Sequence, residues 1–166
     1  MELQLEYPAT PEGAPQHAEL AVESTRNSSQ LNLDYSPQSL SQIDQIIEAL
    51  RADGVGPLQV GESLFGFGCY VGEVFVRHNQ AKWRLASETP MKDIAMFPIV
   101  LEVFPGKFCN PIGKVFKRLI SPEVDDLAMF YQTFTTPDKQ TQSDESAGNV
   151  TPTEQKKGLW KRLFGG

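Results

Sequence analysis

Residues 61–78 constrain the fold of this chain more than any other segment. Their sequence is GESLFGFGCYVGEVFVRH, which places apolar residues at nearly every position around a helix. A helix that is apolar all round is buried on most sides, so the other elements must enclose it. Gly66, Gly68 and Gly72 would each cost about 1 kcal/mol relative to alanine, which is tolerable where a neighbouring element approaches the helix backbone closely. A strand over residues 71–76, favoured by β-branched side chains, is the competing interpretation, and we predict the helix.

Three further helices are predicted from apolar residues at helical spacing. The first starts at Ser36-Pro37, a pair typical of helix starts, and ends near Gly54; its buried face consists of Leu40, Ile43, Ile47 and Leu50. The second spans residues 112–120 and includes Ile120 on its inner face. The third starts at a second Ser-Pro pair, at residues 121–122, and places Val124, Leu127, Ala128 and Tyr131 inward.

Two strands follow the long apolar helix. Residues 81–86 alternate, with Ala81, Trp83 and Leu85 on one face and charged residues on the other, as in a half-buried strand. Residues 99–104 form a nearly continuous apolar strand between two prolines, and residues 107–109 could add a third. We therefore predict an α+β fold, in which helices pack on a small antiparallel sheet of two to three strands.

Composition divides the chain into four parts. Residues 1–30 predict an irregular acidic leader, in which residues 17–27 could form a short helix, and residues 31–134 a single α+β domain. Residues 135–155 contain almost no large apolar residue, which is typical of a disordered linker. Residues 156–166 predict a basic amphipathic C-terminal helix.

Charge and composition exclude several classes of function. The formal net charge is −6, and residues 1–35 carry six acidic residues against Arg26 alone, so binding to nucleic acid is disfavoured. Two histidines and two cysteines without a CxxC pair cannot form a zinc site of the usual spacing, and we expect no metal and no cofactor. The start of the chain has no secretory signal and no apolar run is long enough to span a bilayer, which predicts a cytoplasmic protein.

Glu73 is the most conspicuous single residue, because a carboxylate within an apolar helix is costly unless it has a partner. It could act as a general acid or base, anchor a ligand, or form a structural ion pair with Arg77 one turn away. A second candidate is the basic face formed by Lys114, Lys117 and Arg118, which is either solvated or docks an acidic partner.

The end of the chain carries the strongest candidate for a docking element. An apolar face formed by Leu159, Trp160, Leu163 and Phe164 lies largely opposite a basic face formed by Lys157, Lys161 and Arg162. Such a segment behind a flexible tether is typical of a helix that docks in a groove of a partner protein or on an anionic membrane. It could also fold back onto its own domain.

Residues 33–40 read LDYSPQSL, and residues 68–74 read GCYVGEV and are followed by Trp83. In these segments the chain resembles small bacterial proteins of uncharacterised families. The resemblance implies a bacterial origin and an α+β fold, and it implies no activity.

Together these features favour a non-enzymatic intracellular binding or adaptor protein, whose tethered C-terminal helix docks on another protein. The alternatives are a small hydrolase-like enzyme that uses Glu73, and a peripheral membrane protein held at an anionic membrane surface by its C-terminal tail. The sequence does not indicate an oligomeric state.

Overall fold

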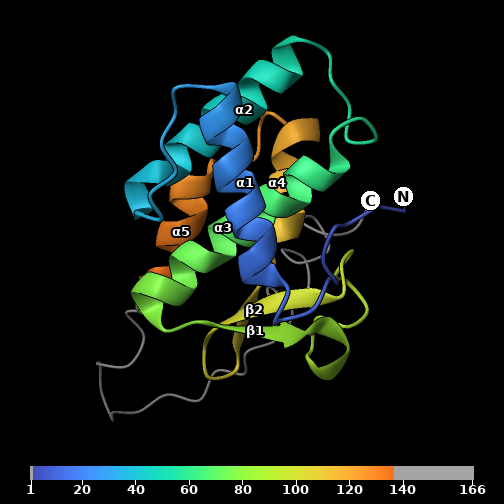
Figure 1. The fold of residues 1–166 in the computed structure, drawn as a ribbon. Helices are drawn as coiled ribbons and strands as arrows, with labels where there is room; N and C mark the ends of the chain where they lie inside the picture. The colour runs from blue at the N-terminus through green and yellow to red at the C-terminus, as the bar shows by residue number, and fades with distance from the viewer. Residues whose placement is uncertain (1, 137–166) are drawn as a thin grey trace. The chain divides into compact units, whose positions relative to one another are not determined.

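The apolar segment forms the central helix of the structure, α3 (Gly61–Asn79), and its side chains are buried from Leu64 to Phe75. The computed structural model describes residues 2–136, which fold as one unit of five α-helices and a three-stranded antiparallel sheet. Figure 1 shows α1 (Ala14–Ser28) crossing in front of α3, with the sheet below both. The α+β prediction is confirmed, and so is the helix at 61–78 rather than a strand at 71–76.

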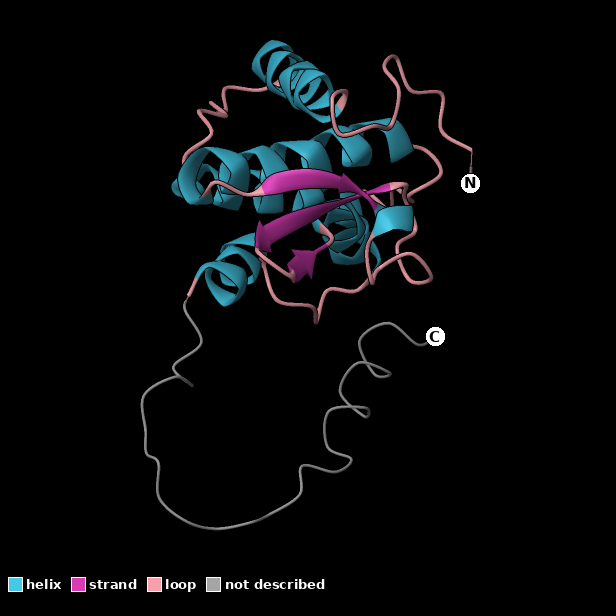
Figure 2. Ribbon diagram, turned by 90° about the horizontal axis from the view of Figure 1, so that it is seen from below, coloured by secondary structure: helices cyan, strands magenta, loops and turns pink. Residues whose placement is uncertain are grey.

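The remaining elements surround α3 on several sides. They are α2 (Leu40–Ala52), β1 (Lys82–Leu85), β2 (Ile99–Phe104), β3 (Lys107–Cys109), α4 (Pro111–Ile120) and α5 (Leu127–Thr135), with short 3-10 turns at Pro37–Ser39 and Ala86–Glu88. The strand order is β1-β2-β3, and Leu101 of β2 pairs with Trp83 on one side and Cys109 on the other. Figure 2 shows the sheet lying along one side of the longest helix, α3.

Three glycines of α3 allow three different neighbours to approach its backbone. A β-carbon at Gly68 would overlap the backbone of Ile112 in α4, and one at Gly72 would overlap the indole ring of Trp83 in β1. At Gly66 it would lie only 3.2 Å from the carbonyl oxygen of His17 in α1. The cost of glycine in a helix interior is therefore offset by close packing on three sides.

The N-terminal region belongs to this unit, which corrects the predicted domain boundary at residue 31. Helix α1 is longer than the expected residues 17–27 and buries Ala14, Ala18, Ala21 and Val22 in the same core as α3. The acidic residues of this region lie on its outer side, where Glu19 and Glu23 are exposed. The acidic residues of α1 therefore belong to the solvent-exposed face of an amphipathic helix, and not to a leader separate from the domain.

The turn before α2 is held by a residue with unusual backbone geometry. Tyr35 has φ of 62°, its backbone N–H donates to the Tyr70 hydroxyl (2.8 Å), and its carbonyl oxygen accepts from Nε2 of His78 (2.9 Å). Its ring stacks on Tyr70 with a centroid distance of 4.7 Å. Ser36 then accepts from the Ser39 N–H (3.2 Å) and caps the 3-10 turn Pro37–Ser39. The predicted capping by the Ser-Pro pair is confirmed, but α2 itself begins at Leu40, directly after this turn.

The last helix begins later than its Ser-Pro pair predicts. Residues 121–126 form a loop with a single turn at residues 122–123, and α5 starts at Leu127 with the carboxylate of Asp126 accepting from the Met129 N–H (2.7 Å). The carbonyl oxygen of Val124 accepts from Arg118 (3.0 Å) in this region, so it is used by a tertiary contact and not by a helix. Tyr131, expected in the core, is only partly buried.

Replacing Gly72 by alanine tests the close packing on α3. We expect the added methyl group to displace Trp83 and to lower the free energy of unfolding by about 1–3 kcal/mol, measured by chemical denaturation. Gly56→Ala is the matched control, because a β-carbon there would meet only the side chain of Gln59 at 3.7 Å. An equal effect of the two substitutions would contradict the packing explanation.

Candidate functional site

A groove lined only by apolar residues lies where separate segments of the described chain meet. We call it the apolar groove; it has a volume of about 620 Å³ and is lined by Leu3, Leu5, Ala9, Pro57, Leu58, Phe65, Met96, Phe97, Pro98, Phe116 and Ile120. Its aromatic rings contact one another, since Phe97 lies 5.4 Å from Phe65 and 4.9 Å from Phe116 between ring centroids. These rings are buried and connect the groove to the core of the domain.

Three side chains at this groove are strongly exposed. Leu58, Met96 and Ile120 expose 82%, 69% and 62% of their surface, more than any other large apolar residue among residues 2–136. Single exposed apolar residues are common on protein surfaces, but several around one groove mark an interaction site. The groove is therefore the strongest candidate functional site in the described residues.

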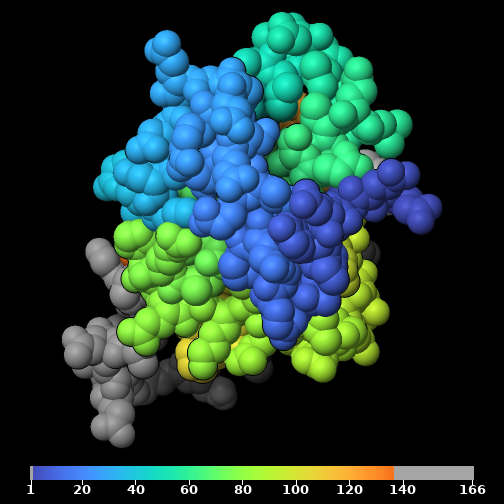
Figure 3. Space-filling view, in the orientation of Figure 1, coloured from blue at the N-terminus to red at the C-terminus, as the bar shows by residue number. Residues whose placement is uncertain are grey.

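One wall of the groove is the extended N-terminal segment. Along residues 2–9, exposed residues alternate with half-buried ones, and Leu3, Leu5 and Ala9 line the groove. The backbone is fastened at two points: the Gln4 N–H donates to Glu62 (3.1 Å), and Nε2 of His17 donates to the Tyr7 carbonyl oxygen (2.9 Å). In Figure 3 this segment, in dark blue, covers the surface beside the loop that precedes α3.

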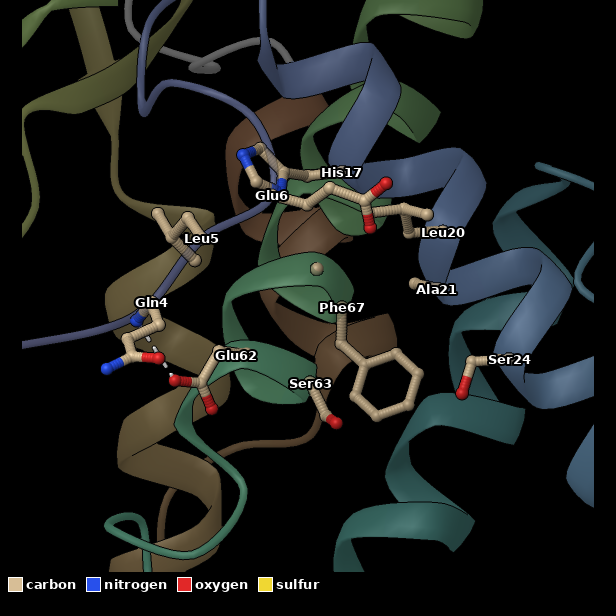
Figure 4. Close-up of a pocket in the computed structure, with 11 residues that line it drawn as sticks. Gln4, Leu5, Glu6, His17, Leu20, Ala21, Ser24, Glu62, Ser63 and Phe67 are labelled. Atoms are coloured by element: carbon tan, nitrogen blue, oxygen red, sulfur yellow. Dashed lines mark hydrogen bonds between the residues drawn. The ribbon is translucent and has the colours of Figure 1, made fainter.

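A second, more polar groove of about 300 Å³ lies on the other side of this segment, and Leu5 lines both. Figure 4 shows its polar residues, which include Glu6, His17 and Glu62, and the bond from Gln4 to Glu62. His17 is buried between the rings of Tyr7 and Phe65, and this burial lowers the pKa of its imidazole. Its role here is to hold the N-terminal segment in place.

Glu73 is buried and accepts a hydrogen bond from Nε1 of Trp83 at 2.9 Å. It lines neither groove, nor the third one, of about 320 Å³, between α1 and α2. The predicted ion pair with Arg77 is wrong, because the Arg77 guanidinium lies over the ring of Tyr35 at 3.4 Å and approaches Glu19 at 3.7 Å. The hydrogen bond from Trp83 to Glu73 therefore fixes the orientation of the indole ring in the core.

The predicted basic face on α4 does not form. Arg118 is buried, and its guanidinium donates to Asp44 (3.0 Å) and Glu48 (2.9 Å) of α2. Lys114 lies 5.6 Å from the ring centre of Phe130, and burial lowers its pKa. Lys117 is half-buried. Spacing along one helix predicted three outward basic residues, but an acidic partner on a neighbouring helix brings Arg118 inside.

The predicted docking residues of the C-terminal segment lie outside the described residues. These are Lys157, Leu159, Trp160, Lys161, Arg162, Leu163 and Phe164. Residues 137–155 of the predicted linker also lie outside them, whereas Thr135 ends α5.

Within residues 2–136, no group of three or more histidine, cysteine or acidic side chains is placed to hold a metal ion. Cys69 and Cys109 are buried free thiols, and burial raises the pKa of each. None of the helices in this range has the length and apolar character needed to cross a membrane.

Comparisons with known proteins returned no similar protein: no family model matches this chain, and no match was found among curated proteins or solved structures.

The groove was missed by the sequence analysis, although part of its signal is present. Leu58 follows Pro57, and Met96 stands two residues before Pro98. Both are apolar residues in segments without helical or strand periodicity, so no buried face of a helix or strand accounts for them. Ile120 was expected inward and is exposed instead. No local pattern indicates that these three residues line one groove, because they come from distant parts of the chain.

Replacing Glu73 by leucine tests its structural role. We expect a loss of about 1–3 kcal/mol in the free energy of unfolding, because the buried Trp83 N–H loses its acceptor. Glu73→Gln should lose less, since an amide oxygen can accept the same bond. Glu23→Leu, an exposed position on α1, serves as the control in the same denaturation series. Equal stability of the leucine and glutamine variants would contradict this role.

The buried histidine predicts a pH dependence of stability. Below pH 6.5, the ordinary pKa of histidine, the unfolded chain binds a proton that the folded state does not, because the pKa of His17 is lowered in the fold. The contribution of this residue to the free energy of unfolding should therefore fall as the pH decreases below 6.5. We expect His17→Gln to flatten the dependence of the free energy of unfolding on pH between pH 7 and 5 relative to wild type, measured by chemical denaturation at each pH. The same pH dependence in the variant and the wild type would contradict this prediction.

Proposed function

We propose that this protein is a non-enzymatic cytoplasmic binding protein, which acts as an adaptor by holding an apolar segment of a partner protein in the apolar groove. The observation that carries this proposal is the concentration of the three most exposed large apolar side chains around one groove. The C-terminal segment 156–166 is the second docking element of the adaptor, on the basis of its basic amphipathic sequence.

The composition of the groove favours a peptide over a small molecule. Sites for small molecules combine an apolar lining with a few polar groups that fix the orientation of the ligand. All the side chains that line this groove are apolar, so main-chain groups are its only polar atoms. The apolar face of an amphipathic helix satisfies its own backbone hydrogen bonds and needs no polar partner within the groove.

The size of the apolar contribution predicts a reversible complex. Burying a large apolar side chain fully is worth about 1.5–3 kcal/mol, so Leu58, Met96 and Ile120, which are already partly buried, together offer at most about 4.5–9 kcal/mol before other costs. Lost translational and rotational freedom costs about 4–15 kcal/mol. The side chains of the partner must therefore contribute as well, and we expect an affinity in the micromolar range or weaker.

A charge placed in the groove tests this function. We expect Met96→Glu in the full chain to weaken binding of a fluorescent 18-residue helical peptide, made of leucine and glutamine with leucines on one face, by about tenfold or more. Met129→Glu is the matched control, because Met129 is exposed (49%) but lines none of the three grooves. An equal effect of the two substitutions on affinity, with both variants folded by circular dichroism, would contradict the proposal.

A further inference from the structure

The charges beside the apolar groove define the chemistry of its partner more narrowly. We propose that the groove takes a basic amphipathic helix of a partner protein, with its apolar face against the groove and its lysines or arginines beside the N-terminal segment. This inference rests on the proposed function, and it adds the charge of the partner.

The same segment that forms the apolar wall also carries acidic residues at its exposed positions. Leu3 and Leu5 line the groove, whereas Glu2 and Glu6 are exposed. Leu5 also borders the polar groove, which Glu6 and Glu62 line, so the two grooves adjoin at Leu5. In Figure 4 the Glu6 side chain extends toward Leu20 and Glu62 lies near Gln4, both on the side of the polar groove. An occupant of the apolar groove that extends past Leu5 therefore meets these negative charges.

The N-terminal region has no basic residues that could neutralise its carboxylates. Residues 1–25 contain five acidic residues and no lysine or arginine. In the loop on the opposite side, the exposed Lys92 and Asp93 have opposite signs. On α4, the Arg118 guanidinium is bound by Asp44 and Glu48, and Lys117, next to the lining residue Phe116, is half-buried. The exposed carboxylates Glu2 and Glu6 of the N-terminal segment therefore give the groove an acidic edge on that side.

Complementary charge at the rim of an apolar contact adds selectivity and speeds association more than it adds affinity. Such charges are exposed, so their effect is screened by salt over a Debye length of about 10 Å at 0.1 M ionic strength. The proposal therefore predicts a preference for basic helices that decreases when salt is added. The same charges repel an anionic membrane, which disfavours a lipid surface as the occupant of this groove.

The experiment compares three 18-residue helical peptides that share one leucine face and carry lysine, glutamine or glutamate on the other. We expect the full-length protein to bind the lysine peptide at least fivefold more tightly than the glutamine peptide, and the glutamate peptide more weakly than both. At 0.5 M NaCl the preference should fall below twofold. Fluorescence anisotropy gives the affinities, and circular dichroism checks that each variant is folded.

Two double variants locate the effect. Glu2→Gln with Glu6→Gln should remove most of the preference for lysine while leaving the affinity for the glutamine peptide unchanged, because both carboxylates are exposed and neither lines the apolar groove or fastens its N-terminal wall. Glu23→Gln with Asp125→Asn, which removes two exposed charges away from the three grooves, should keep the preference. Loss of the preference in both double variants would mean that it comes from the net charge of the protein and not from the carboxylates near the groove, which would overturn the proposal.

The possible failures are distinguishable. Equal binding of the lysine and glutamine peptides, with both abolished by Met96→Glu, overturns the inference about charge and leaves the binding function intact. No binding of any peptide overturns both. Stronger binding to vesicles containing phosphatidylserine than to the lysine peptide identifies a membrane as the occupant. Tighter binding of the lysine peptide after deletion of residues 156–166 assigns the groove to the chain's own C-terminal segment. Either the vesicle result or the deletion result overturns the proposal that a helix of a partner protein occupies the groove.

Discussion

The backbone of α3 is open to its neighbours on three sides because glycines stand at positions 66, 68 and 72, and the rest of the domain depends on the contacts made there. Helix α1 lies against Gly66, Ile112 of α4 against Gly68, and Trp83 of β1 against Gly72. Side chains at these positions would keep the neighbouring elements apart. Dispersion contacts weaken steeply with separation, so the close approach is what gives these interfaces their packing energy.

The apolar groove is a consequence of the same arrangement. Phe65 of α3 forms the base of the groove. Phe97, in the loop between β1 and β2, packs against Phe65, and Phe116 of α4 packs against Phe97. The N-terminal wall is held by Glu62 of α3 and by His17 of α1. The exposed residues Leu58, Met96 and Ile120 are therefore placed around a rigid base, which suits a surface that must keep its shape for a partner.

The buried charged side chains Glu73 and Arg118 have partners within the domain, which separates them from the surface proposed to bind. Glu73 holds the indole of Trp83, and Arg118 joins α4 to Asp44 of α2. Removing one partner from such a buried pair leaves an uncompensated polar group, so these residues are expected to matter for stability. The acidic residues Glu6 and Glu62 differ, because both are exposed and line the polar groove, which adjoins the apolar groove at Leu5.

The sequence by itself determined the elements whose pattern is local. The apolar run at 61–78, the alternation around Trp83 and the strand at 99–104 each indicated their structure, because burial on one or all sides imposes a period on the residues. Tertiary structure decided the rest. Residues 1–30 joined the core, Arg118 turned inward to Asp44, and Ile120 turned outward to line a groove with Leu58 and Met96. These outcomes depend on residues far apart in the chain, whose proximity is set by packing around α3 and is invisible to any local period.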